Sequence, residues 1–412
     1  MAAHPEAARR RGLLLLAAVV AVLGLVPIDG AGAAATAPAG YRLVAAETLG
    51  PGVEHRTLRR EQPPTDVHVA RLAPGMAGRL LPVLGNDVLS GPSAGRETTT
   101  SMCVRVRCVA AVNGDFFDGA GRPIGAMVSA GELLTTPGPE HILLRVDSRG
   151  RPTLRPGIDW RVAVATADGQ VVAAQAVNRP LAGDGVALYT GRWGPTTPAD
   201  PAATEVSLRL PPSAGILPSG SSPVRVGAAR AGGGVPIAGG HVVLSGRGAG
   251  AGAVANLARW ASSGAVLHVD VGGIVTALGG SPQLLHDGAP AFPAEVSDDF
   301  TRGRHPRTMV GVTPAGELLL VTADGRGASA GLSLAEAATL LRGLGAVDAL
   351  NLDGGGSTTF VAGGSVRNVP SDGRERPVAA ALTVMAGGPP DPLTSLLTQV
   401  TDDLAAVLQP PR

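Results

Sequence analysis

Several short segments of the sequence place Asn, Asp or Arg beside glycine directly after an apolar run. The clearest is AVDALNLDGGGSTTF at 346–360, where Asn351 and Asp353 precede three glycines, 354–356, and Ser357. Glycine weakens a strand, so consecutive glycines indicate that a ligand or another part of the chain approaches the backbone closely. The same pattern recurs with Asn113 and Asp115, with Arg307, with Asp324 and Arg326, and with Arg376.

These residue types suit a ligand that carries both a phosphate and a sugar. Arginine presents a planar fork of donors that matches phosphate oxygens, and successive backbone N–H groups of a glycine turn can bind an anion. Carboxylates at strand ends can act as acid, base or nucleophile in glycosyl chemistry. Any single DG or GG pair is equally typical of a hairpin turn, so the hypothesis depends on the recurrence of the pattern.

Other motifs suggest different chemistry. Residues 91–95, GPSAG, match the nucleophile elbow of hydrolases, but the elbow requires a following helix, and 96–109 is predicted to be strand-like. Residues 246–251, GRGAGA, fit a dinucleotide fingerprint, with Asp270 where a ribose-binding acid would lie. The absence of further βαβ units favours a single strand–helix–strand crossover. His268 shares a strand face with Asp270, and the pair fits a satisfied, partly buried pair at least as well as it fits a metal or active site.

Composition narrows the functional class. The formal net charge of +1 argues against a nucleic-acid partner, and the absence of lysine excludes a Schiff base or a P-loop. Residues 1–35 have a basic start, an apolar run and an Ala-Gly-Ala site, which predict a signal peptide and no stable membrane span after its removal. In a secreted or cell-envelope protein, Cys103 and Cys108 are predicted to form a disulfide that fixes the turn before Asn113. No further cysteine exists to complete a zinc site.

The elements that must position these residues are mostly short strands separated by turns. Before residue 388, two helices are expected, at 252–264 and at 332–346, the second beginning with a capping box. Strand-rich sequence with few helices predicts a single α+β domain with a mixed β-sheet core over 41–387. Residues 388–412 are predicted to form a linker and an amphipathic helix.

The sequence resembles the phosphodiester glycosidase family in an ordered set of segments: NGDFF…GRPIGAMVSAGEL, HPRTMVGVTPAGELLLVTADGR, GLSLAEAATLLRGLGAVDALNLDGGGSTTF and NVPSDGRERPVAAAL. The resemblance extends over about residues 95–387 and is strongest after residue 300. It includes LGGSPQLLHDG at 278–288. Family members carry a glycine-rich strand and helix at the position of 246–251 without binding a dinucleotide.

The resemblance implies an exported enzyme that hydrolyses a sugar-1-phosphodiester to free sugar and phosphomonoester, without a cofactor or a metal. The substrate would be a small-molecule or polymer glycan phosphodiester. The expected catalytic residues are Asp324, Asp353 and Asp115. The expected substrate-binding residues are Asn113, Arg307, Arg326, Asn351, Gly354, Gly355, Gly356, Ser357 and Arg376. Two other functions stay open: a non-catalytic cell-envelope module that binds anionic glycans, and a dinucleotide-binding enzyme.

Overall fold

The computed structural model of the protein describes residues 37–387, except 92–94, 137, 139–140, 213–216, 218, 262–263 and 293–298. The described residues belong to one compact unit. The predicted signal peptide at 1–35 and the predicted linker and helix at 388–412 lie outside the described residues. Within the described part of the chain, no helix is both long and apolar enough to cross a membrane.

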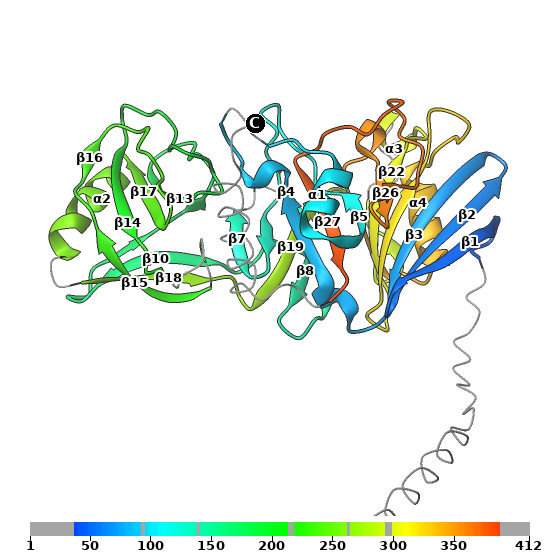
Figure 1. The fold of residues 1–412 in the computed structure, drawn as a ribbon, viewed down its shortest axis with the longest axis horizontal. Helices are drawn as coiled ribbons and strands as arrows, with labels where there is room; N and C mark the ends of the chain where they lie inside the picture. Colours follow the sequence, from blue (N-terminus) through cyan, green and yellow to red (C-terminus); the bar gives the residue numbers. More distant parts are fainter. Residues whose placement is uncertain are drawn as a thin grey trace, which may run out of the picture. The chain divides into compact units, whose positions relative to one another are not determined.

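An eight-stranded antiparallel sheet contains Arg307 and Asn351, and Asp324 and Asp353 follow two of its strands (Figure 1). Its strand order is β1-β2-β3-β23-β22-β24-β20-β21, so strands from both ends of the chain lie side by side. The strands are β1 (Tyr41–Gly50), β2 (Val53–Glu61), β3 (Pro64–Leu72), β20 (Gln283–His286), β21 (Ala289–Pro290), β22 (Arg307–Val312), β23 (Leu318–Ala323) and β24 (Asp348–Asn351).

The central strands β22 and β23 are buried along their whole length. Successive side chains point to opposite faces of a sheet, so a continuous apolar run marks a strand covered on both faces. Met309 and Leu319 pack in the same cluster as helix α4 (Leu334–Gly343). Val310 and Leu320, one residue further along each strand, pack in the cluster shared with a second sheet. The site segments are therefore attached to a rigid core.

The second sheet has the order β26-β25-β5-β27-β4 and is antiparallel. Its strands are β4 (Leu80–Leu84), β5 (Cys108–Asn113), β25 (Phe360–Ala362), β26 (Ser365–Val366) and β27 (Ala380–Met385). Because β5 lies between β25 and β27, its residues 110–112 are paired on both sides, and Asn113 is paired with Ala381 of β27. A third sheet, of order β7-β6-β19-β8-β9, contains β6 (Met127–Ser129), β7 (Glu132–Thr135), β8 (Ile142–Asp147), β9 (Pro152–Pro156) and β19 (Ile274–Gly280).

The remaining strands form a nine-stranded sheet with its own apolar cluster, to which helix α2 (Ala249–Trp260) contributes Val254 and Leu257. These strands are the green elements of Figure 1. They are β10 (Arg161–Thr166), β11 (Val171–Ala173), β12 (Ala176–Val177), β13 (Gly185–Tyr189), β14 (Thr204–Arg209), β15 (Gly220–Val226), β16 (Arg230–Ala231), β17 (His241–Arg247) and β18 (Ala265–Asp270).

The prediction of a strand-rich chain with few helices is confirmed, and both predicted helices are present as α2 and α4. The capping box of α4 has both of its hydrogen bonds, between Ser333 and Glu336. The expected mixed sheet is limited, among the described strands, to the parallel pair β12 and β13. A short helix α3 (Asp299–Arg302) was not predicted.

The prediction of a strand at 96–109 is wrong, because Thr99–Val106 forms helix α1 before β5 begins. Thr98 caps the helix by accepting a hydrogen bond from the backbone N–H of Ser101, and Met102 lies fully buried on its inner face. The cap and this burial outweigh the strand preference of the Thr and Val residues. A helix therefore follows 91–95, but the nearest regular element before it is a 3-10 turn at Gly85–Asp87 rather than a strand.

Candidate active site

The antiparallel register of the eight-stranded sheet brings several predicted segments to one end of three strands. β22 begins at Arg307, opposite the last residue of β23, and two residues later it faces Asn351, the last residue of β24. Asp324 and Asp353, which follow β23 and β24, therefore leave the sheet where β22 begins. The sequence could not show this proximity, because it depends on which strands pair.

Asn113 connects the second sheet to this place. Its side-chain N–H donates to the backbone carbonyl of Asp353 at 2.6 Å, and its side-chain oxygen accepts from the Thr308 hydroxyl at 2.7 Å and from the backbone N–H of Thr359 at 3.1 Å. Asn113 is fully buried. These hydrogen bonds join Asn113 to other parts of the protein, which favours a role in positioning the Asp353 segment.

Asp353 carries a carboxyl whose ionisation is disfavoured. Burial raises the pKa of Asp353 to about 6, and the nearby charge of Asp115 acts in the same direction. The Ser357 hydroxyl, the positive charge of Arg376 and the backbone N–H of Gly354 oppose this increase in the pKa. Ser357 is fully buried and its hydroxyl makes no hydrogen bond of standard geometry with the described residues, so its effect on Asp353 reflects proximity. A pKa near 6 suits a group that exchanges protons near neutral pH.

The three glycines after Asp353 lie under other groups. A Cβ at position 354 would lie 2.8 Å from the backbone oxygen of Pro306, and the N–H of Gly355 donates to that same oxygen at 2.9 Å. Gly355 has a φ of +59°, which residues with a side chain rarely adopt. A Cβ at Gly356 would collide with the Arg376 guanidinium and the Asp372 carboxylate. The run of glycines is therefore required by close approach, although the approaching groups are parts of the protein itself.

Two guanidinium groups cover the glycine turn. An atom of the Arg326 guanidinium lies 3.3 Å from the Cβ position of Gly355, and its other contact is with Nδ1 of His305 at 3.3 Å. Arg326 makes no ion pair with the described residues, and its side chain is exposed. Arg376 is paired with Asp372, its Nε donating at 2.9 Å. Of these two guanidinium groups, that of Arg326 is the more available to an anionic ligand.

Asp324 lies close to the glycine turn, and hydrogen bonds hold its carboxylate in place. Its oxygens accept from the side chain of Asn368 and from the backbone N–H of Val369, each at 3.0 Å. Burial raises the pKa of Asp324 to about 6 despite these two bonds. Asn368 also donates to the Thr358 carbonyl, so Asp324 braces the segment that follows the glycines.

Arg307 does not face a ligand in the way the sequence predicts. Its side chain is 1% exposed, and it donates to the backbone carbonyls of Leu332, Phe300 and Gly303 while its guanidinium lies 4.9 Å from the centroid of the Phe300 ring. Burial lowers the pKa of Arg307 to about 10, and repulsion from Arg326 adds to the effect. These contacts favour a role in holding α3 beside β22 over direct binding of phosphate.

Asn351 is also buried. Its side-chain N–H groups donate to the backbone carbonyls of Ser281 and Leu352, at 2.8 and 2.9 Å. Its side-chain oxygen is buried without a hydrogen-bond partner among the described residues. The donor contacts tie the end of β24 to the β19–β20 connection, so Asn351 also holds the strand end in place.

Asp115 is buried, with only 2% of the residue exposed to solvent. It accepts from the backbone N–H groups of Phe116 and Gly125, and His141 Nδ1 lies 3.6 Å from one of its oxygens. Its charge reaches Asp353, as the increased pKa of that residue shows. Two neighbouring glycines, Gly125 and Gly279, leave room for the carboxylate, since a Cβ on either would touch it.

Sequence reasoning missed two contributors, Thr308 and His141. Thr308 is one residue along β22 from Arg307 and is fully buried, and no pattern in the sequence distinguishes it from an ordinary strand residue. His141 precedes β8 without any motif around it. His305, two residues before Arg307, is in contact with Arg326.

The dinucleotide fingerprint has a structural explanation. β17 and β18, which α2 connects, are separated by β14 and β15 and run antiparallel to each other, so they form no parallel βαβ unit. Gly248 has a φ of +53°, and a Cβ there would collide with the Asp184 carboxylate at the start of α2. The Asp184 carboxylate therefore lies where the dinucleotide fingerprint would place a pyrophosphate. His268 accepts or donates a hydrogen bond with the Ser221 hydroxyl at 2.8 Å, and both residues are exposed.

Residues 220–385 match the family described as "Phosphodiester glycosidase". The resemblance read from the sequence is therefore confirmed for this part of the chain, and the family is one of hydrolases. The matched range contains Asp324, Asp353 and the glycine turn, whereas Asn113 and Asp115 precede it.

Curated relatives match over short stretches. The chain is 50% identical over 66 residues to the N-acetylglucosamine-1-phosphodiester alpha-N-acetylglucosaminidase of Mus musculus, which is 16% of this chain and 13% of that protein. It is 46% identical over 66 residues to the protein of the same name from Homo sapiens, again 16% and 13%. The chain thus matches only about an eighth of the length of these relatives.

Solved structures share the fold over most of the chain. A hypothetical protein from Synechocystis has a TM-score of 0.60 at 24% identity, covering 81% of this chain and 61% of that one. A protein from Burkholderia pseudomallei, provisionally described as exported, has a TM-score of 0.57 at 26% identity, covering 78% and 74%.

Proposed function

We propose that this protein is an exported glycosidase that cleaves the bond between a sugar and a phosphodiester, releasing free sugar and a phosphomonoester. The observation that carries the proposal is the glycine turn after β24. The turn places a buried carboxyl with a pKa raised to about 6, that of Asp353, beside a turn covered by the guanidinium groups of Arg326 and Arg376. The family match over 220–385 and the names of the curated relatives support the same reaction.

The chemistry divides between the carboxyl and the cations. A guanidinium pairs with the phosphate oxygens of the diester and stabilises the charge that grows on them as the C1–O bond breaks. The Asp353 carboxylate acts at the sugar carbon, either as nucleophile or as the base that accepts a proton from water. The hydroxyl of water ends on C1 of the sugar, and the electron pair of the broken bond stays on the phosphate. Phosphate leaves readily, so no metal is required for this step.

Isotope labelling identifies the broken bond. The purified protein is incubated in ¹⁸O-enriched water with the methyl diester of N-acetylglucosamine-1-phosphate, and both products are analysed by mass spectrometry. We expect ¹⁸O in the free sugar and none in the methyl phosphate. Label in the phosphate would show P–O cleavage and would contradict the proposal.

Matched variants assign the reaction to the site. Asp353→Asn is expected to abolish turnover, while Asp270→Asn, an exposed aspartate on β18, should retain it. Activity should persist in the presence of a chelator, and complete loss would favour a metal-dependent phosphodiesterase. If no sugar-1-phosphodiester is hydrolysed but Asp353→Asn and Asp324→Asn bind an anionic glycan as the wild type does, the chain is a glycan-binding module.

Export is part of the proposal. It is supported by the sequence of residues 1–35, by the disulfide between Cys103 and Cys108, and by the similarity to a protein provisionally described as exported. Disulfides persist in oxidising compartments and are rare in the reducing cytosol. Mass spectrometry of the protein recovered from outside the cytoplasm should find a chain that begins near residue 34.

A further inference from the structure

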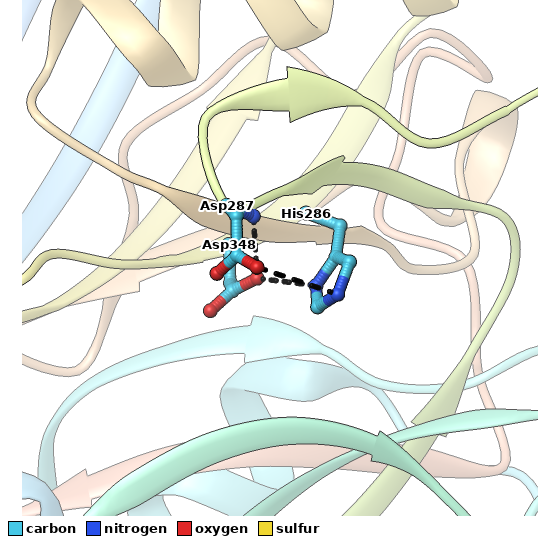
Figure 2. Close-up of side chains that lie close together, drawn as sticks. All are labelled: His286, Asp287 and Asp348. Atoms are coloured by element: carbon cyan, nitrogen blue, oxygen red, sulfur yellow. Dashed lines mark hydrogen bonds and ion pairs between the residues drawn. The ribbon is translucent and has the colours of Figure 1, made fainter.

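A second cluster of titratable side chains lies at the opposite end of β24 from Asp353. His286 is the last residue of β20, Asp287 begins the turn to β21, and Asp348 is the first residue of β24, which pairs with β20. Figure 2 shows the three side chains close together at this turn. One possible ligand atom from each residue lies within 4.8 Å of the other two. No sequence motif groups these three residues, because Asp348 is far from His286 and Asp287 along the chain.

Hydrogen bonds orient the imidazole within the cluster. Nδ1 of His286 lies 3.1 Å from Oδ1 of Asp348, and the backbone N–H of Asp287 donates to the same oxygen at 3.3 Å. Nε2 of His286 is then directed toward Oδ2 of Asp287, 3.7 Å away. Metal-ligating histidines usually donate their other ring N–H to a carboxylate, which fixes the tautomer. Two ligands of a tetrahedral zinc ion stand roughly 3.4 Å apart, so a small rotation of Asp287 would bring both within reach of one ion.

Charge at this cluster is not balanced by arginine. Asp287 and Asp348 each form an ion pair with His286, and neither forms one with an arginine of the described residues. The whole sequence holds 34 basic residues and no lysine, and many other carboxylates of the structure, such as Glu317 and Glu132, are paired with arginine. Two carboxylates beside one imidazole, with no arginine of the described residues paired to either, favour the binding of a cation.

The turn geometry explains the backbone of Asp287 but not the convergence of the three side chains. Asp287 and Gly288 have φ values of 48° and 79° and connect the paired residues His286 and Ala289, as in a two-residue hairpin turn. Asparagine serves equally well in the first position of such a turn. Neither His286 nor Asp348 is required by it, and Asp348 is distant in sequence.

We propose that His286, Asp287 and Asp348 bind a divalent transition-metal ion, for which zinc is the reference. Nε2 of His286 and the Asp287 carboxylate are the ligands, Asp348 orients the imidazole and supplies a further oxygen, and water completes the coordination. An imidazole ligand favours zinc over calcium or magnesium, which prefer oxygen alone. The side chain of Asp287 is 85% exposed and that of His286 46%, so the ion can enter from solvent.

The ion would connect the β20–β21 turn to the first residue of β24. The last residue of that strand is Asn351, which leads into Asp353, so metal binding would stabilise the strand that carries the proposed catalytic carboxyl. The ion lies at the other end of the strand and takes no part in the reaction. The inference is thus independent of the proposed function and requires no measurement of activity.

The test is isothermal titration of the full chain, freed of metal by chelator and dialysis, with zinc chloride. We expect one strong site per chain, and a melting temperature that rises with zinc concentration because the ion binds the folded state. Asp287→Asn keeps the turn and removes a ligand, so it should weaken binding at least about tenfold while the metal-free protein melts as the wild type does. His286→Gln and Asp348→Asn should weaken binding by a similar factor.

Two controls keep the inference falsifiable. His268→Gln removes an exposed imidazole on β18 and should leave zinc binding unchanged. A competing cluster exists where His55 contacts both Glu47 and His68, at 2.9 and 3.1 Å. Binding that survives Asp287→Asn but is lost in His55→Gln would overturn the proposal, as would absence of zinc binding at millimolar concentration. Tighter binding of calcium than of zinc would contradict the ligand assignment.

Discussion

Replacing Asp353 with asparagine tests whether the fold holds this carboxyl where its charge is disfavoured. Burial raises the pKa of Asp353 to about 6 from an ordinary value of 3.8. Two pKa units correspond to about 3 kcal/mol. The folded protein binds this proton more tightly than the unfolded chain does, so the stability that the group contributes is present below about pH 4 and is lost as the pH rises through about 6.

Asparagine is uncharged at every pH, so Asp353→Asn avoids this loss. We expect the free energy of unfolding of the variant to increase, relative to that of wild type, by roughly 2–3 kcal/mol between about pH 4 and pH 7.5. Asp324→Asn is the matched comparison, because the pKa of Asp324 is also raised to about 6. Both oxygens of Asp324 accept hydrogen bonds, so its replacement should show a similar pH-dependent gain offset at both pH values by about 1–3 kcal/mol.

The assay is urea unfolding of wild type and both variants at the two pH values, with the slope m compared to confirm that the unfolded states are alike. Hydrolysis of the sugar-1-phosphodiester is measured on the same preparations. A difference between Asp353→Asn and wild type that is the same at both pH values would refute the reasoning. A variant that keeps its activity would remove Asp353 from the chemistry even if the stability change is as expected.

Two further predictions concern the glycine turn and the disulfide. Gly356→Ala places a Cβ against the flexible end of Arg376 and should raise KM for the diester several-fold with little change in melting temperature. Gly354→Ala places a Cβ 2.8 Å from a backbone oxygen and should lower the melting temperature. A larger drop in melting temperature for Gly356→Ala than for Gly354→Ala would contradict the geometry. The double variant Cys103→Ser, Cys108→Ser should lose about 2 kcal/mol of stability or less. Its activity should stay near that of wild type, because the strand after Cys108 is paired on both sides. A large loss of activity would show that the disulfide controls the site.

The sequence correctly predicted the features that are determined by residues close together in the chain. The run of glycines at 354–356 marks a turn with close approach, and the capping box of α4 is formed as predicted, because both features are set within a few residues. Helix α1 was missed for a related reason. Its Thr and Val residues favour a strand, and only the cap at Thr98 and a buried inner face make it a helix.

The roles of individual polar residues could not be read from the sequence in the same way. Arg307 and Arg326 follow similar patterns, yet one is buried among backbone carbonyls and the other is exposed above the glycine turn. Their difference depends on the register of β22 against β23 and on the position of α3, which are long-range features. The contribution of Thr308 depends on its distance to Asn113, a residue of another sheet.

Burial separates the groups that hold the site from those that can reach a ligand. Asn113, Asn351 and Thr308 are fully buried and donate to or accept from other parts of the protein, which fixes the ends of β5, β24 and β22 against one another. Asp353 is partly exposed and Arg326 is exposed, and both lie at the glycine turn that these bonds hold in place. A carboxyl kept at a raised pKa costs stability, and it persists only when the surrounding structure is over-determined. The hydrogen bonds of Asn113 and Asn351 provide these additional constraints. Loss of either side chain should therefore disturb Asp353, although neither side chain contacts the substrate.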